Sequence, residues 1–208
     1  LADSGAGITA ALNEVLSSMG ADLLTEDEKR FIIGPAFQLT MPVLLRTRGL
    51  DESLSDGMIT EYRRIYTANH LPRTPRIDGI GDVIEELAQH FLLSVVTAKP
   101  VNQAGIAVEA LGMTGLFETV VGPQPDRPVP KARLLEDALA FIENKHGARP
   151  HNDACWMIGD RHHDIDAATE VGTRSVGVLW GYGDEAELTT AGATAIARVP
   201  ADLLGILT

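Results

Sequence analysis

The sequence predicts an α/β fold: a doubly wound parallel sheet with helices on both faces, together with a smaller helical segment. The first observation is a change at about Pro75, after which short, continuously apolar runs alternate with amphipathic stretches. The second is that apolar residues between Ile8 and about His70 recur every three or four positions. Continuous apolar runs are typical of parallel strands buried on both faces, and a spacing of three or four is typical of helices.

Several short helices are expected in the N-terminal segment, because glycine and proline interrupt its apolar pattern. The interruptions are Gly20, Gly34-Pro35, Pro42, Gly49 and residues 72–75. The apolar positions that carry the helical pattern are Ile8, Leu12, Val15, Leu16, Met19, Phe31, Ile32, Met58, Ile59, Tyr62 and Ile65.

From Pro75 onward the chain is expected to alternate between helix and strand. Helices are expected at about 82–90, 103–111, 133–145 and 165–171. Strands are expected at 92–97, 119–121, 155–158 and 175–179. Strands separated by helices form parallel sheets, and ligands bind beyond the carboxyl ends of those strands. Candidate functional residues are therefore those that directly follow each apolar run.

Composition and charge indicate a compact globular protein and argue against several partners. The chain has 208 residues, 45% of them hydrophobic, enough for one core or a core with a small insert. Its 29 acidic and 17 basic residues give a formal net charge of −12, which removes the attraction on which nucleic-acid binding depends. No apolar stretch is long enough to span a membrane, and no basic leader precedes one, so we expect no membrane partner and a cytoplasmic location. The single cysteine, Cys155, cannot form an internal disulfide and is expected to fill the core.

Polar side chains follow two of the expected strands. Thr97 and Lys99 come after the first apolar run, and Asp160 and Asp164 come after the third. Lys131 stands at the start of the helix between them. We expect a hydroxyl, a lysine and two carboxylates to converge on one crevice, where the carboxylates suit a hard cation such as Mg²⁺.

Each of these residues also has a purely structural interpretation. Asp164 could cap a helix that begins at Ile165, and Asp160 could be a turn residue. Thr97 could likewise be a turn or cap residue. Lys131 could be a solvated lysine, although a cation is unfavourable at a helix N-terminus. The order and common placement of the four favour the functional interpretation.

A set of segments in this chain carries a resemblance to a known family. They are LADSGAGITAAL (1–12), IGP (33–35), TAKP (97–100), PKARLLEDAL (130–139), GDRHHDIDAA (159–168) and VGVLWGYG (176–183). In this order they resemble the haloacid dehalogenase superfamily, specifically its phosphoglycolate-phosphatase-like members with a helical cap. The resemblance covers nearly the whole chain. It implies a Rossmann-like core at 1–7 and 76–208 and an inserted α-helical cap at 8–75.

The resemblance also implies a role for each expected site residue. Thr97 and the backbone of Ala98 would bind the transferring phosphoryl group, and Lys131 would balance its charge. Asp160 and Asp164 would hold Mg²⁺. Arg127, in RPVP at 127–130, also resembles the lysine position, but the Lys131-Ala132 pair fits the pattern better.

His162 and His163 superficially suggest a zinc site. Adjacent residues at a helix start are expected to diverge, however, and no further Cys/His spacing supports zinc. We therefore expect these histidines to support the site from outside or to face solvent.

The first motif of the family, DxDGT, carries the nucleophilic and the acid/base aspartate, and it does not occur at the start of these residues. Asp3 resembles the residue pair that follows that motif and is expected to be an N-cap or hinge residue. We expect the sequence to be part of a longer protein, because loss of the central strand would expose the interior of the sheet.

With that motif upstream, the resemblance implies a Mg²⁺-dependent phosphatase that acts on small phosphate esters through an aspartyl-phosphate. The cap would close over the site and select the substrate. Another interpretation, from a different class, is a binding module that keeps the metal site without catalysis.

The same fold is also compatible with a protein tyrosine kinase, with ATP as donor and a partner tyrosine phosphatase as acceptor. In that case an exposed tyrosine such as Tyr182 would be self-modified; otherwise Tyr182 is expected to pack at the core edge. The sequence has no Walker A loop and no HRD or DFG motif, which excludes an ordinary kinase fold.

Overall fold

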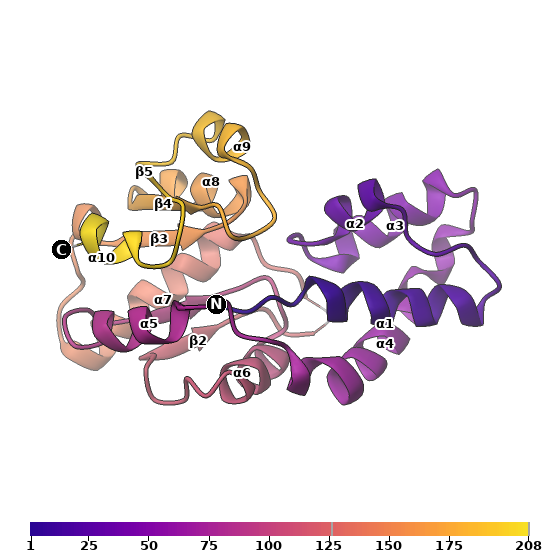
Figure 1. Cartoon of the computed structure of the whole chain (residues 1–208), viewed down its shortest axis with the longest axis horizontal. Coiled ribbons are helices and arrows are strands. Elements are labelled where there is room, and N and C mark those ends of the chain that lie inside the picture. The colour runs from indigo at the N-terminus through magenta and orange to yellow at the C-terminus, as the bar shows by residue number, and fades with distance from the viewer. Residues whose placement is uncertain (126, 208) are drawn as a thin grey trace.

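The computed structural model describes residues 1–125 and 127–207, and it shows a helical part and an α/β part side by side (Figure 1). The chain begins between them, forms the helical part and then builds the α/β part. The elements of the helical part are α1 (Gly5–Ser18), α2 (Glu26–Ile32), α3 (Phe37–Thr47), η1 (Glu52–Leu54), α4 (Ser55–Ile65), η2 (Tyr66–His70) and η3 (Leu71–Arg73). In the described ranges, no helix combines the length and the apolar character that crossing a bilayer requires.

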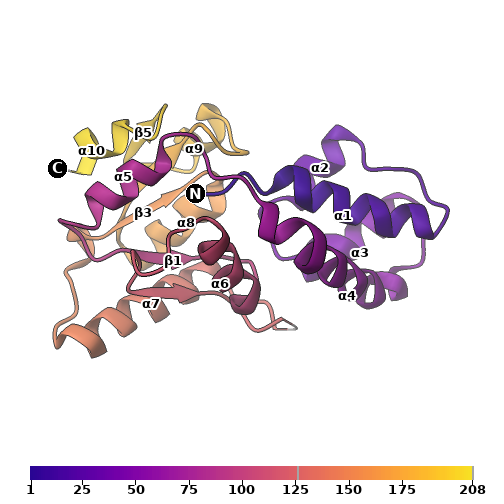
Figure 2. The ribbon, with the colours of Figure 1, turned by 60° about the horizontal axis from the view of Figure 1, so that its bottom comes forward.

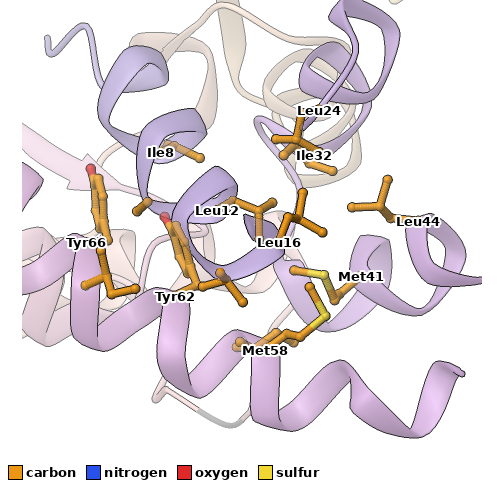
Figure 3. Close-up of a cluster of buried hydrophobic side chains, with 14 of the residues drawn as sticks. Ile8, Leu12, Leu16, Leu24, Ile32, Met41, Leu44, Met58, Tyr62 and Tyr66 are labelled. Carbon is orange, nitrogen blue, oxygen red and sulfur yellow. The ribbon is translucent and has the colours of Figure 1, made fainter. Parts of the chain in front are cut away.

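The helical part has an apolar core of its own (Figure 3). Leu12 of α1, Met41 of α3 and Met58 of α4 are all buried in it. Tyr62 and Tyr66 stack at its edge, with ring centroids 5.4 Å apart. The helical spacing of apolar residues in the sequence is thus the spacing of side chains that share this core.

A paired arginine and glutamate hold α2 in place. Thr25 and Glu28 form a capping box at the start of α2. Arg48, which follows α3, donates from Nε to Glu28 Oε1 and from Nη2 to Oε2, both at 2.6 Å. The hydrogen bonds from this guanidinium lower the pKa of Glu28 to about 2. The pair fixes the helix whose C-terminal end faces the α/β part.

The α/β part confirms the expected fold class. Its elements are α5 (Ile80–Leu87), β1 (Ser94–Val96), α6 (Val101–Ala110), β2 (Thr119–Val121), α7 (Lys131–His146), η4 (Asn152–Ala154), β3 (Trp156–Gly159), α8 (His162–Val171), β4 (Arg174–Val178), α9 (Glu185–Thr190), β5 (Ala195–Ala197) and α10 (Asp202–Leu207). In the described residues, the pairings between these strands are all parallel. Each of the four expected strands is present, but β5 was not expected, because a three-residue Ala-Ile-Ala run has weak β-propensity.

The strands form two separate sheets, β1–β2 and β3–β4–β5. In the second, Ile158 of β3 lies opposite Val176 of β4. Within the described residues, β1 and β3 are not hydrogen-bonded to each other. A cavity of about 890 Å³ has Val95 and Val96 of β1 and Met157 of β3 among its lining residues. The neighbouring edges of the two sheets therefore face a shared cavity.

Two adjacent segments connect the helical and α/β parts (Figure 2). The N–H of Asp3 donates to the carbonyl oxygen of Pro75 at 2.9 Å, and the N–H of Ile77 donates to that of Leu1 at 3.0 Å. The chain thus enters and leaves the helical part at one place, a geometry suited to a hinge.

The core of the helical part gives a test of this packing. Leu12 is fully buried, whereas Leu23 is 57% exposed. We expect Leu12→Ala to lower the free energy of unfolding by about 2–5 kcal/mol, through lost transfer free energy and a residual cavity. The matched Leu23→Ala change is expected to stay within about 0.5 kcal/mol. Urea denaturation of both variants measures the difference, and equal effects would contradict the described core.

Candidate active site

The carboxyl ends of β1 and β3 open into the same cavity. Thr97 follows β1 directly, and Asp160 follows β3. Both line the cavity, as do Lys131 at the first position of α7 and Asp164 in the first turn of α8. All four side chains that the sequence singled out thus line one cavity, and two of them, Lys131 and Asp164, are in direct contact. Arg127, the alternative cation, is exposed and is not among the lining residues.

Asp164 is a buried carboxylate with two partners. Its residue is 4% exposed, and Oδ1 pairs with Nζ of Lys131. Its Oδ2 accepts a hydrogen bond of 3.2 Å from the N–H of Arg161. The helix begins at His162 rather than near Ile165, so Asp164 lies inside the first turn and not before it. It stabilises the helix N-terminus and pairs with the lysine at the same time.

Asp160 is oriented by the WGYG segment after β4. Its Oδ2 accepts a hydrogen bond of 2.8 Å from the N–H of Tyr182, and its carbonyl oxygen accepts one of 2.8 Å from Gly183. A Cβ on Gly181 would overlap the Asp160 carboxylate, and a Cβ on Gly159 would overlap that of Asp164. The close approach of both acids thus requires glycine at these positions. Sequence reasoning missed this role, although both glycines lie in segments that carry the family resemblance.

Thr97 and Lys99 form a compact turn after β1. The Thr97 hydroxyl accepts a hydrogen bond of 3.1 Å from the N–H of Lys99. The Lys99 ammonium donates to the hydroxyl of Tyr66 at 3.0 Å and lies 4.5 Å from the centroid of that ring. Lys99 therefore joins the edge of the cavity to the helical part.

Arg161 makes a second connection between the two parts. Its Nη1 donates to the carbonyl oxygen of Ile33 at 2.7 Å, and its Nε donates to Glu187 Oε1 at 2.8 Å. Burial alone would raise the pKa of Glu187, but the N–H of His162 and the Arg161 guanidinium outweigh it and lower the pKa. Gly34 approaches the same guanidinium with φ +119°, a conformation that favours glycine. Arg161 was not singled out from the sequence. Its position between Asp160 and Asp164 was the one signal that it lies at the site.

Tyr182 packs between the α/β part and the hinge. Its hydroxyl donates to Asp3 Oδ1 at 3.2 Å. Burial, with the charge of Asp3, raises the pKa of Tyr182 to about 12. A Cβ on Gly5 would overlap the Tyr182 ring. The phenol is therefore protonated near neutral pH and contacts the hinge, while the residue as a whole remains 38% exposed.

The two adjacent histidines do not diverge, contrary to the expectation from the sequence. The ring centroids of His162 and His163 lie 3.7 Å apart. His162 Nδ1 also lies 2.8 Å from Asp166 Oδ2. Asp166 is three residues after His163 and four after His162, and both spacings place side chains on one helix face. The expectation compared only His162 with His163 and did not take account of Asp166, the neighbour that both histidines share.

Comparison with known proteins places this geometry in a family. Residues 1–178 match the family model for haloacid dehalogenase-like hydrolases. A haloacid dehalogenase-like hydrolase of solved structure from Streptococcus pneumoniae has a TM-score of 0.86 and 24% identity, covering 100% of this chain and 93% of its own. At that identity the likeness shows the fold.

Two curated relatives carry activity names. Tyrosine-protein kinase PtkA from Mycobacterium tuberculosis is 32% identical over 185 residues, which is 88% of this chain but 60% of the kinase. Its solved structure has a TM-score of 0.78 and 28% identity, covering 100% of this chain and 94% of that structure. A 5'-nucleotidase from Pseudomonas aeruginosa is 28% identical over 189 residues, covering 90% of this chain and 82% of the nucleotidase. The match of most of the chain to one family model, together with the shared fold, shows that this protein belongs to the haloacid dehalogenase-like hydrolases.

Proposed function

We propose that the protein is a Mg²⁺-dependent phosphoryl-transfer enzyme, and specifically a phosphatase that acts on phosphate esters. The observation that carries this proposal is that Thr97, Lys131, Asp160 and Asp164 all line one cavity, with Thr97 and Asp160 directly after the carboxyl ends of β1 and β3. A hydroxyl, an ammonium group and paired carboxylates can position a phosphoryl group and stabilise its charge, which is most of what phosphoryl transfer requires. The names of the nucleotidase and of other phosphatases among the relatives support the same reaction class.

In this proposal Thr97 and Lys131 bind the phosphoryl oxygens. The Thr97 hydroxyl accepts from the N–H of Lys99, so its own proton is available to donate to an oxygen of the phosphoryl group. The N–H of Ala98, in the same turn, is assigned to a second phosphoryl oxygen. The Lys131 ammonium, paired with Asp164, reduces the negative charge around the ester.

Asp160 and Asp164 are assigned to the metal. Both carboxylates line the cavity, and each is oriented by a backbone N–H, from Tyr182 and Arg161 respectively. Oriented carboxylate oxygens fit a hard cation such as Mg²⁺. When bound, Mg²⁺ supplies positive charge to the phosphoryl oxygens. The carboxylates contribute by holding that charge at the strand ends.

The nucleophile is proposed to come from a further parallel strand between β1 and β3. The facing strand edges and the apolar side chains of α5 and α7 around the cavity suit such a strand. Leu1 lines the same cavity, so a segment preceding Leu1 would be positioned to supply the strand. An aspartate at its carboxyl end would attack phosphorus, forming a carboxylate O–P bond and breaking the ester P–O bond. A second acid would protonate the leaving alcohol, then take a proton from the water that hydrolyses the acyl-phosphate.

Residues 8–75 are proposed to act as the cap, hinged on the segments at Asp3 and Pro75. Contacts from Arg161 to Ile33, Lys99 to Tyr66 and Gln38 to Pro125 join the cap to the rest of the protein around the cavity. Opening the cap would admit the substrate, and closing it would exclude bulk water. We propose a cytoplasmic location for the enzyme, which the one cysteine of residues 1–208, unpaired in the structure, supports.

The second candidate is a kinase that transfers phosphate from ATP to a protein tyrosine, with a tyrosine phosphatase as the partner. The 32% identity to PtkA favours it, although the chain spans 60% of that kinase. Both activities use the same residues and differ in the acceptor. Free phosphate released from an ester alone distinguishes the phosphatase, and phosphotyrosine on an added protein distinguishes the kinase.

Asp160→Asn in the full-length protein tests the site. With Mg²⁺ and a generic phosphate ester, we expect release of free phosphate to fall about 100-fold or more, because the substitution removes a carboxylate that would hold the Mg²⁺ whose charge stabilises the phosphoryl group. Asp153→Asn, at an exposed position in η4, is the control and is expected to retain full activity. Equal activity in the two variants would contradict the assignment, and a native protein without Mg²⁺-dependent turnover on either donor would favour the binding module.

Arg161→Gln tests the connection between cap and site. Loss of the contacts to Ile33 and Glu187 is expected to lower kcat/KM roughly 10- to 100-fold by weakening cap closure. Glu187→Gln should act through the same connection. The fold decrease in kcat/KM of the double variant is therefore expected to be much smaller than the product of the fold decreases in the two single variants. Arg149→Gln, which breaks the ion pair to Glu136 away from the cavity, is the matched control. Fully multiplicative losses would show that Arg161 and Glu187 act separately.

A further inference from the structure

A second group of metal-ligating side chains lies on the first turns of α8, apart from the residues assigned to phosphoryl transfer. His162, His163 and Asp166 each offer one ligand atom, and these atoms lie within 4.8 Å of one another. The two imidazole rings are 3.7 Å apart between centroids, and Asp166 Oδ2 lies 2.8 Å from His162 Nδ1. No step of the proposed phosphoryl transfer uses any of the three.

The helix itself holds the three side chains together. Asp166 is the i+4 neighbour of His162 and the i+3 neighbour of His163, so its carboxylate lies on the face that both rings can reach. The three ligand atoms already lie within 4.8 Å of one another, so binding of a single ion requires side-chain rotations rather than a rearrangement of the helix. The arrangement therefore needs no movement of the fold.

The chemistry of this group differs from that of the cavity. Two imidazole nitrogens and one carboxylate oxygen suit borderline transition metals such as Zn²⁺, whereas Mg²⁺ prefers oxygen ligands throughout. Three protein ligands satisfy most of a tetrahedral zinc shell and leave one position open. We propose that His162, His163 and Asp166 form a binding site for a divalent transition metal of the Zn²⁺ class, separate from the Mg²⁺ ligands.

Exposure and nearby charge are compatible with this site. The side chain of His162 is 40% exposed and that of Asp166 is 58% exposed, so a metal can reach them from solvent. A helix N-terminus disfavours a cation, but this effect is modest compared with direct ligation. Glu187, whose Oε1 accepts from the N–H of His162 at 2.8 Å, lies beside the site, and its charge is balanced by its ion pair with Arg161.

The chain contains a matched control for the simpler alternative, an ordinary helical ion pair. His90 and Glu86 form an i, i+4 pair, with 3.3 Å between His90 Nε2 and Glu86 Oε1. They belong to no group of three metal-ligating side chains among the described residues. A site that depends on three ligands should thus bind metal where the His90–Glu86 pair does not.

The test measures Zn²⁺ binding by the full-length protein in competition with a chromophoric chelator. Millimolar Mg²⁺ is present to occupy the carboxylates of the cavity, and Cys155→Ser in every sample removes the only thiol of these residues. His162→Gln, His163→Gln and Asp166→Asn are compared with His90→Gln. Each of the first three is expected to weaken Zn²⁺ binding at one site by roughly 10- to 100-fold or more, because loss of even an outer partner of a metal ligand costs that much.

A second readout does not depend on activity. Co²⁺ in place of Zn²⁺ should give visible absorption bands of nitrogen and oxygen coordination in the parent protein and in His90→Gln, but not in His163→Gln. Circular dichroism without metal checks that each variant is folded.

Three results would overturn the proposal. The first is unchanged Zn²⁺ affinity in all three cluster variants. The second is a loss in His162→Gln and Asp166→Asn with none in His163→Gln, which would reduce the cluster to a two-residue pair. The third is an equal loss in His90→Gln. The readouts are metal binding and absorption spectra, not activity. A negative result for this metal site therefore does not bear on the proposed phosphatase activity, and absence of phosphatase activity does not bear on the metal site.

Discussion

The buried carboxylate of Asp164 is the constraint on which the arrangement of the site depends. A carboxylate that is almost excluded from water is costly unless it is paired and hydrogen-bonded, and here Lys131 and the N–H of Arg161 meet that need. These partners tie α7 and the loop after β3 to the start of α8. A buried ion pair is on balance no more stabilising than well-packed apolar residues of the same size. The presence of this pair in the lining of a cavity fits the phosphoryl-transfer chemistry proposed for the site.

The second constraint is the division of the sheet. β1 and β3 each have a partner on one side, and between them lies a cavity whose wall along the strands is apolar. Unpaired strand edges and buried backbone groups without partners are unfavourable, so a strand in this position would satisfy groups on both neighbours. Its carboxyl end would fall between Thr97 and Asp160. The proposed position of the nucleophile thus follows from the same geometry as the proposed phosphate-binding and metal-binding residues.

Much of this architecture could be predicted from the sequence, because the signals were local. The β-branched run before Thr97 and the apolar run before Asp160 identify two strands, and the rule for parallel sheets brings their ends together. What could not be predicted depends on contacts between distant segments. The link from Arg161 to Ile33 and the packing of Gly181 on Asp160 join residues far apart in the chain, and nothing in the spacing of either segment reveals its partner. The side chains of His162 and His163 were expected to diverge, and this expectation was wrong. It compared the two adjacent positions without their common neighbour Asp166.

The position of the nucleophile is the most direct test of the account as a whole. The full-length protein would be mixed with Mg²⁺ and a phosphate ester, and the reaction would be quenched in denaturant. Reduction with borotritide then converts an aspartyl-phosphate to labelled homoserine. Digestion and mass spectrometry identify the labelled residue. The account predicts one label, on an aspartate that precedes Leu1 in the chain and belongs to the strand between β1 and β3. A label on Asp3, Asp160 or any other residue of this sequence, or turnover without any label, would contradict it.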